Sequence, residues 1–499
     1  MLPVARLLFP AIRWDPRTGF AGEAEAIHAA LRRGVGGFTI FGGPADAVAE
    51  LTEGLRARSD HPLLIASDLE RGAGQQFAGT TALPPLAALG SLDDLDATRR
   101  AAALTAREAM ALGINWIHAP VADVDLEPRN PIIGSRAFGT RPESVARHVA
   151  AWIRGCHEEG ALCCAKHFPG HGRTVDDSHA LLPRVAASRP ELDEADLKPF
   201  HAAVRAGVDS IMTAHVAFSA LDPSGTAATL SHEIIGGLLR RELGFSGLIV
   251  TDALIMRGLI EAGADEPSAA VSAVAAGCDA LLYPSDLDAV TRALEAGIGR
   301  SLSEPRAADA IERVSAVTAR SPACRDGEWG RAEDRAWATS IGERAIVTAR
   351  GEPRATLASH VSLDVLTIDD DVGGPFAAPP RDAFPRALRA AGFDVREVEG
   401  ADVASDTARR QPEIAAGEAN RTLVVALYAD IRAWKGRPGL TEDAQARLAE
   451  IVARRPPALI LLFGHPRLAA DMPGETVVAA WGGEPIMQES AARWLAATT

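Results

Sequence analysis

The chain has 499 residues, of which 47% are hydrophobic and 23% are charged, and its formal net charge is −15 at pH 7. This length exceeds what one hydrophobic core usually organises, so the composition predicts a globular protein with two domains and argues against a disordered chain. The 51 basic residues are spread along the chain. The sequence contains no basic patch, so we do not expect a nucleic-acid partner.

The sequence also predicts where the protein resides. The opening stretch, MLPVARLLFPAIRWDP, has no basic segment leading into an apolar one, and no later stretch approaches the ~20 apolar residues that span a bilayer. The five cysteines are an odd number without metal-ligand spacing, and Cys163 and Cys164 lie in an apolar run where free thiols pack as small hydrophobes. We therefore expect a cytoplasmic protein with no membrane partner, present as a monomer or homodimer.

Residues 1–300 alternate short apolar runs with amphipathic stretches whose apolar residues recur at three- and four-residue steps. The runs are predicted strands, at 5–12, 35–43, 62–72, 114–124, 161–170, 209–218, 247–254 and 278–286. Repeated strand-helix units with strands buried on both faces indicate a parallel sheet, and eight units predict a (β/α)₈ barrel of the TIM type.

The rest of the chain predicts a second α/β unit. Residues 301–340 are charged and alanine-rich, and Pro322 and Gly327 mark a linker there. Five further apolar runs follow as predicted strands, at 362–370, 393–400, 422–430, 458–464 and 476–483, and Thr441 is a candidate N-cap of an amphipathic helix over 441–455. We predict a barrel domain over 1–320, a linker over 321–340, and a smaller doubly wound α/β accessory domain over 341–499.

Active sites of such barrels lie at the carboxyl ends of the strands. Charged and imidazole side chains occupy these positions here: Asp68, Glu70, Asp123, Asp125, Lys166, His167, His215, Asp252 and Asp286. One loop is denser still, because KHFPGHGRTVDDSH at 166–179 holds three histidines, a lysine and two aspartates. Gly170 and Gly172 are expected to let this loop close over a ligand.

The motifs KHFPGHG and DSH, with NPIIGSRAFG upstream and LGFSGLIVTDAL downstream, resemble glycoside hydrolase family 3, specifically its β-N-acetylglucosaminidase branch. The resemblance implies a retaining exo-β-N-acetylglucosaminidase that forms a covalent glycosyl-aspartate and acts on peptidoglycan fragments or chitooligosaccharides. It implies Asp252 as nucleophile, Asp177 with His179 as the acid/base pair, and no cofactor. The residues implied to hold the hydroxyls of the sugar are Asp68, Arg136, Lys166 and His167.

The sequence departs from the family pattern after the third predicted strand. The family usually shows Asp-Gln-Glu-Gly-Gly and then an arginine, whereas this chain reads DLERGAGQQF, with Arg71 inserted among these positions and Gln76 where the arginine would fall. Glutamine lacks the charge and the fork of a guanidinium, so a cationic clamp on the sugar is missing or replaced.

The residue types suit this chemistry, because retaining glycoside hydrolysis needs an anionic nucleophile and a group that first donates and later accepts a proton. Histidine, with an unperturbed pKa of about 6.5, serves both proton steps near neutral pH, and a carboxylate two residues away can orient its ring. A metal site at His167, His171 and His179 is not expected, because their spacing falls on a Gly/Pro loop and not on an aligned helix face.

Structural alternatives remain for single residues. Asp252 could be a helix N-cap, Asp68 could pair with Arg71, Arg136 could tie down its own loop, and His215 could be a packed residue of the barrel rim. For the whole protein the alternatives are a phosphorylase or a β-glucosidase of the same family, and a non-catalytic sugar-binding protein. Loss of Asp252, Asp177 or His179 would have favoured the binding protein.

Overall fold

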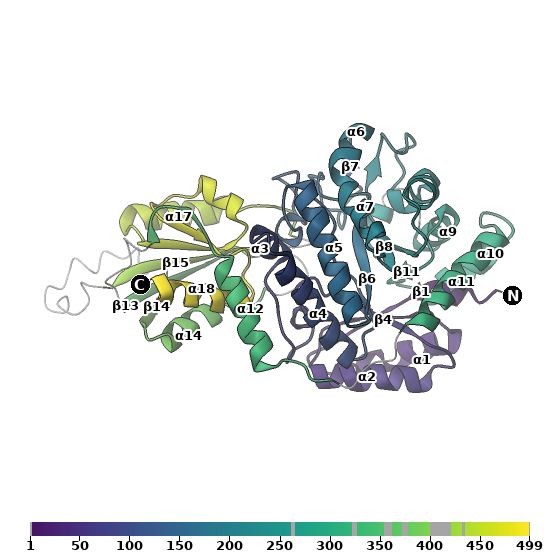
Figure 1. Cartoon of the computed structure of the whole chain (residues 1–499), viewed down its shortest axis with the longest axis horizontal. Helices are drawn as coiled ribbons and strands as arrows, with labels where there is room; N and C mark the ends of the chain where they lie inside the picture. Colours follow the sequence, from purple (N-terminus) through teal and green to yellow (C-terminus); the bar gives the residue numbers. More distant parts are fainter. Residues whose placement is uncertain are drawn as a thin grey trace.

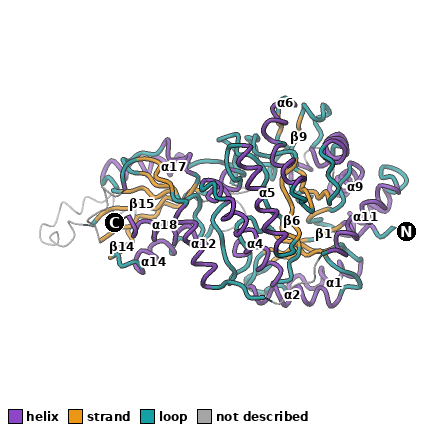
Figure 2. The backbone as a smooth tube through the Cα atoms, in the orientation of Figure 1, coloured by secondary structure: helices purple, strands orange, loops and turns teal. Residues whose placement is uncertain are grey.

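A computed structural model describes residues 2–260, 265–321, 327–353, 362–371, 378–399, 421–431 and 435–498. Two lobes stand side by side in Figure 1, and helix α12 (Ala332–Arg344) lies between them. The larger lobe holds the amino-terminal strands and the smaller lobe holds the carboxyl-terminal ones. Figure 2 shows the strands at the centre of each lobe with helices outside them.

The larger lobe is an eight-stranded parallel barrel, as predicted. Each of the eight apolar runs contains a strand: β1 (Leu8–Phe9) with β2 (Ala11–Arg13), β3 (Gly37–Phe41), β4 (Leu64–Ser67), β5 (Trp116–Ile117), β6 (Leu162–Phe168), β8 (Ser210–Thr213), β10 (Leu248–Thr251) and β11 (Leu281–Leu282). Seven of these strands form one sheet in the order β10-β8-β6-β5-β4-β3-β2. The ring closes because β1 pairs with β11 and Val250 bridges to Ala280 beside β11.

Helices cover the barrel. The principal ones are α1 (Ala24–Arg33), α2 (Ala45–Arg58), α4 (Leu95–Ala111), α5 (Pro142–Glu158), α7 (Lys198–Arg205), α9 (Glu266–Ala276), α10 (Leu287–Gly297) and α11 (Glu304–Arg320). Of these, α4, α9, α10 and α11 begin at a side-chain cap. Asp94 accepts the Ala97 N–H at the start of α4, and Asp286 caps α10 in the same way through Ala289. Asp286 is therefore a helix cap and not a site residue.

The smaller lobe is a six-stranded sheet in the order β12-β17-β16-β15-β13-β14. Its strands are β12 (Val347–Arg350), β13 (Ser362–Asp369), β14 (Asp394–Val398), β15 (Thr422–Ala429), β16 (Leu459–Gly464) and β17 (Val477–Ala479), and only β12 runs antiparallel to its neighbour. Alternate residues of β15 enter two separate cores. One core includes α14 (Ala383–Ala390) and α18 (Pro485–Thr498), and the other includes α17 (Glu442–Arg454), so the unit is doubly wound.

The two lobes meet at the carboxyl ends of the strands of the smaller sheet. Ile431 follows β15, Arg467 lies in the short helix η9 (Pro466–Asp471) after β16, and Glu484 follows β17. All three contact barrel loops. Helix α12 occupies part of the stretch expected to be linker and packs against α18 and α4.

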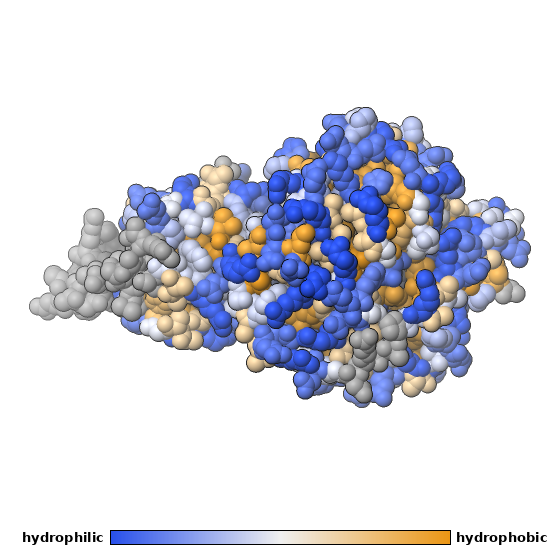
Figure 3. Space-filling view, viewed as in Figure 1, coloured by the Kyte–Doolittle hydropathy of each residue, from blue (hydrophilic) through white to orange (hydrophobic). Residues whose placement is uncertain are grey.

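The predicted Thr441 cap is confirmed, because its hydroxyl accepts the Ala444 N–H at 3.1 Å. Cys163 and Cys164 are fully buried, whereas Cys324 lies outside the described residues. Among the residues that the structure describes, every helix is too short or too polar to cross a membrane. The face drawn in Figure 3 is mostly hydrophilic, with apolar colour confined to scattered areas.

Candidate active site

An ionic network of Asp68, Glu70, Arg136 and Lys166 lies at the carboxyl ends of the barrel strands. Lys166 Nζ donates to Asp68 Oδ1 at 2.7 Å and lies 2.8 Å from Glu70 Oε1. Arg136 donates from Nε and Nη2 to the two oxygens of Glu70, at 2.9 and 2.7 Å. Glu70 and Lys166 are buried. The network thus links Glu70 with three residues that are predicted to hold the sugar. The sequence marked Glu70 only as a strand-end residue.

The ion pairs in this network keep Glu70 and Lys166 ionised despite their burial. Burial raises the pKa of Glu70, but Arg136 and Lys166 outweigh it and hold that pKa well below the ordinary value. Burial lowers the pKa of Lys166, but the two carboxylates raise it above the ordinary value. At neutral pH the network is two anions facing two cations, fixed in geometry and able to exchange hydrogen bonds with hydroxyl groups.

Asp123 orients the next predicted site residue, His167. Its Oδ2 lies 2.7 Å from His167 Nδ1, and its Oδ1 accepts the backbone N–H of His171 at 2.6 Å. A proton on Nδ1 satisfies this contact, so the carboxylate fixes the orientation of the His167 ring. His167, His179 and His215 all lower the pKa of Asp252 electrostatically.

In the loop after β6, the carboxylate of Asp177 contacts both the ring and the backbone of His179. Asp177 Oδ1 lies 2.7 Å from His179 Nδ1 and accepts the His179 backbone N–H at 2.9 Å, so one carboxylate oxygen fixes both ring and backbone. The Asp177 side chain is 3% exposed and that of His179 is 20% exposed. The acid/base candidate therefore reaches solvent or substrate while its partner is buried.

His171 and the loop glycines fix the path of this loop. The His171 ring bonds Thr174 Oγ1 and Ser178 Oγ, each at 2.8 Å, and burial lowers the pKa of His171 to about 4. A Cβ on Gly172 would lie 1.7 Å from the carbonyl oxygen of Val124. Gly172, expected to provide mobility, is thus required for close packing of the loop on the strand-end loop beside it.

Asp252 follows β10, and its surroundings favour the ionised form of its carboxyl group. Its Oδ1 accepts the N–H of Ala253 at 2.7 Å. Burial raises the pKa of Asp252, but His167, His215, His179 and the Ala253 N–H outweigh burial and lower it to about 2. Helix α8 begins only at Arg257, so Asp252 is not its N-cap. A carboxylate that stays ionised at neutral pH can act as a nucleophile.

His215 supports the turn that carries Asp252. Its Nδ1 lies 2.8 Å from Thr229 Oγ1 and its Nε2 lies 3.1 Å from the Ala253 carbonyl oxygen. Burial lowers the pKa of His215, which favours the neutral ring. His215, left out of the predicted site, is thus a packed residue that also fixes the backbone next to Asp252.

Sequence reasoning missed two neighbours of Asp68. The Tyr283 hydroxyl donates to Asp68 Oδ2 at 3.4 Å, and His118 Nδ1 lies 4.0 Å from Asp68 Oδ1. His118 is fully buried, its pKa is lowered by burial to about 4, and neither ring nitrogen has a hydrogen-bond partner among the described residues. Both residues lie inside predicted strands, at 114–124 and 278–286, and only the structure shows that they follow the ends of β5 and β11.

The alternative pairing of Asp68 with Arg71 is replaced by two other ion pairs. Asp68 takes Lys166 as its partner, and Arg71 forms an ion pair with Glu484 of the smaller lobe. Arg71, which departs from the family pattern, therefore forms an ion pair across the two lobes.

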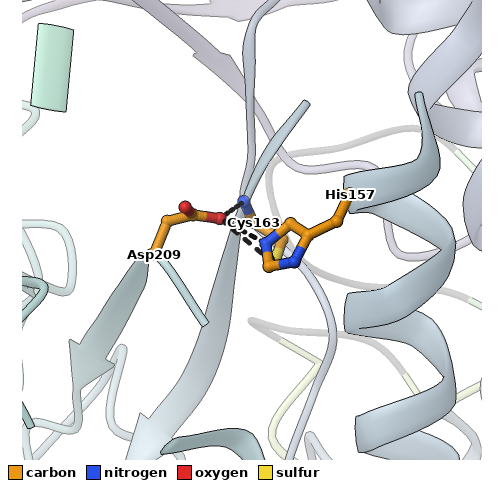
Figure 4. A group of neighbouring side chains, drawn as sticks. All are labelled: His157, Cys163 and Asp209. Atoms are coloured by element: carbon orange, nitrogen blue, oxygen red, sulfur yellow. Dashed lines mark hydrogen bonds and ion pairs between the residues drawn. The ribbon is translucent and has the colours of Figure 1, made fainter. Parts of the chain in front are cut away.

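One group of described residues has metal-ligating types in close proximity: His157, Cys163 and Asp209, near the amino ends of β6 and β8 (Figure 4). His157 Nε2 lies 2.9 Å from Asp209 Oδ2, which also accepts the backbone N–H of Cys163 at 3.0 Å. Hydrogen bonds to Asp209 and Cys163 raise the pKa of His157 to about 10. An ion pair between His157 and Asp209 accounts for this cluster. The cluster lies away from the carboxyl ends of the strands, where the candidate site is.

Known proteins are similar to this chain over most of its larger lobe. The model of the glycosyl hydrolase family 3 N-terminal domain matches residues 18–317. A β-hexosaminidase of Idiomarina loihiensis is 37% identical over 274 residues, which are 54% of this chain and 81% of that protein. A β-N-acetylglucosaminidase/β-glucosidase of Cellulomonas fimi is 36% identical over 285 residues, and this chain spans only 50% of that protein.

Solved structures match both lobes. A family 3 β-N-acetylglucosaminidase from Paenibacillus sp. aligns with a TM-score of 0.84 and 28% identity, over 99% of this chain and 96% of that one. A β-glucoside phosphorylase aligns with a TM-score of 0.85 and 21% identity, over 99% of this chain and 91% of that one, a likeness of fold alone.

Proposed function

The chain belongs to glycosyl hydrolase family 3, and from this we propose that it is a retaining exo-β-N-acetylglucosaminidase. The proposal is carried by the Asp177–His179 contact, which orients the ring of His179, and it is supported by the low pKa of Asp252, to which His179 contributes. Two of the relatives bear names that include β-N-acetylglucosaminidase, and a third is named β-hexosaminidase. We propose terminal β-linked N-acetylglucosamine of peptidoglycan fragments or chitooligosaccharides as the substrate, and a cytoplasmic monomer or homodimer as the working form.

In the first step, the Asp252 carboxylate attacks the anomeric carbon as the glycosidic C–O bond breaks. His179 gives its proton to the leaving oxygen, so the aglycone departs as an alcohol. The ionic network supports this step by holding the hydroxyl groups of the sugar, so that the anomeric carbon faces Asp252. Asp177 stabilises the protonated ring of His179 before transfer and keeps its orientation afterwards.

In the second step, a water molecule attacks the anomeric carbon of the glycosyl-aspartate. His179, now neutral, takes one proton from that water while the bond between sugar and Asp252 breaks. The sugar leaves with retained configuration, and both side chains return to their starting protonation states. One histidine therefore serves as acid and then as base.

The experiment that tests the proposal compares nitrophenyl β-glycosides of N-acetylglucosamine and of glucose, each with and without phosphate. We expect faster release of nitrophenol from the N-acetylglucosamine substrate, with free sugar as the product in both buffers. Sugar 1-phosphate in the phosphate buffer would show a phosphorylase instead, and preference for glucose would show a β-glucosidase. Turnover of neither substrate would contradict the proposal.

A further inference from the structure

At three positions in two loops at the carboxyl ends of the barrel strands, one residue contacts the smaller lobe and a residue close to it in the chain belongs to the candidate site. In the loop after β4, Glu70 takes part in the ionic network through Arg136 and Lys166. The adjacent Arg71 forms an ion pair with Glu484, which precedes α18 in the smaller lobe. A displacement of Arg71 would therefore be passed directly to Glu70, because one peptide unit joins them.

The loop after β5 repeats this arrangement with the charges reversed. Asp123 holds His167 and the backbone of His171. Two residues later, Asp125 accepts two hydrogen bonds from Nη2 of Arg467, at 2.9 and 2.7 Å. Asp125 is 3% exposed, so its charge has been taken out of water and depends on the cation from the smaller lobe.

The third case is a steric contact farther along the same loop. Gly134 has a φ of +36°, and a Cβ there would lie 2.1 Å from Cδ1 of Ile431 and 3.0 Å from Nη2 of Arg467. Arg136, two residues later, forms the paired hydrogen bonds to Glu70. A glycine thus lets the smaller lobe approach the segment that carries a predicted sugar-holding residue.

We propose that the smaller lobe is a positioning element of the sugar site, and that it acts through Arg71, Asp125 and Gly134 on their neighbours Glu70, Asp123 and Arg136. The inference rests on the proposed function for what the site binds. It also explains the departure from the family pattern: the cation of Arg71 holds the second lobe and does not replace the missing clamp at Gln76. Its consequence is that changes confined to the smaller lobe alter sugar affinity.

The test reverses one charge and then restores the pair. Glu484→Arg places a cation against Arg71, and we expect it to raise KM for the nitrophenyl N-acetylglucosamine substrate by about tenfold, with a smaller change in kcat, because the sugar-holding residues lose their positions. Arg71→Glu should do the same. The double variant Arg71→Glu with Glu484→Arg should recover most of the wild-type KM. Glu158→Arg, which breaks the exposed pair with Arg99 on the barrel helices, is the matched control and should leave KM unchanged.

A second measurement needs no substrate. We expect hydrogen–deuterium exchange of residues 68–78 and 120–140 to rise in Glu484→Arg and to return towards wild type in the double variant. Arg467→Met, which leaves Asp125 without its cation, should raise exchange over 120–140 without introducing a new charge. Unchanged exchange in folded Glu484→Arg and Arg467→Met would overturn the inference even if the enzyme is active. Raised exchange in a protein that hydrolyses neither glycoside would instead overturn only the proposed function.

Discussion

Removing the charge of Glu70 should cost far more than removing an exposed glutamate. In Glu70→Gln, one accepting oxygen becomes an amide NH2 group that cannot accept and the negative charge is lost, so Arg136 and Lys166 face the single charge of Asp68. The Glu70 side chain is 5% exposed. Breaking a buried pair from one side costs about 3–5 kcal/mol. We therefore expect a loss of about that size in the free energy of unfolding, together with a raised KM.

The assay is urea unfolding followed by the fluorescence of the barrel tryptophans, with substrate kinetics on the folded protein. Glu143→Gln is the matched control, because Glu143 pairs with Lys198 at the surface with a 68% exposed side chain. Such a pair contributes about 1 kcal/mol or less. If Glu70→Gln is no less stable than Glu143→Gln, the buried network does not hold its charges as the contacts indicate.

Four further outcomes are expected. Asp252→Ala should abolish turnover with an unchanged circular dichroism spectrum; turnover near wild type would exclude it as nucleophile. Asp177→Asn should slow substrates with poor leaving groups more than activated ones, since the ring of His179 loses its orienting carboxylate; equal slowing would contradict this. Because His167, His215 and the Ala253 N–H still lower the pKa of Asp252 when His179 is removed, folded His179→Ala should form the covalent adduct from a dinitrophenyl glycoside at about pH 5 as well as at about pH 7; loss of the adduct at about pH 5 would refute an ionised nucleophile. A chelator should leave the rate unchanged; recovery with zinc after inactivation would indicate a metal site.

The sequence predicted the strands of the barrel because a doubly buried strand is a continuous apolar run. It predicted their ends less well. The run over 114–124 forms a strand only at Trp116–Ile117; an isolated bridge joins Val121 to Lys166 after Pro120, which lacks an N–H. Strand β12 was missed altogether, because this short antiparallel strand is half-exposed and carries no long apolar run. The boundaries proposed for the two domains and the linker stay predictions.

The site was predictable where one motif carries both partners and not where the fold brings them together. Asp177 and His179 are two residues apart, so their pairing followed from the sequence. Glu70 and Arg136 are far apart in the chain, and they meet because the loops that carry them follow the paired strands β4 and β5. The Arg71–Glu484 pair depends in addition on how the two lobes meet, which no local pattern records. His118 resembles any buried residue after a strand until the position of Asp68 is known.

The central claim is that Asp252 forms a covalent bond to the sugar while His179 assists its formation and breakdown. The most direct test is mass spectrometry of His179→Ala mixed with dinitrophenyl β-N-acetylglucosaminide, whose leaving group needs no proton. The account predicts a glycosyl adduct on the peptide that contains Asp252, and faster loss of that adduct when azide is added, with β-glycosyl azide as the product. An adduct on another residue, or an α-glycosyl azide formed without an adduct, would contradict it.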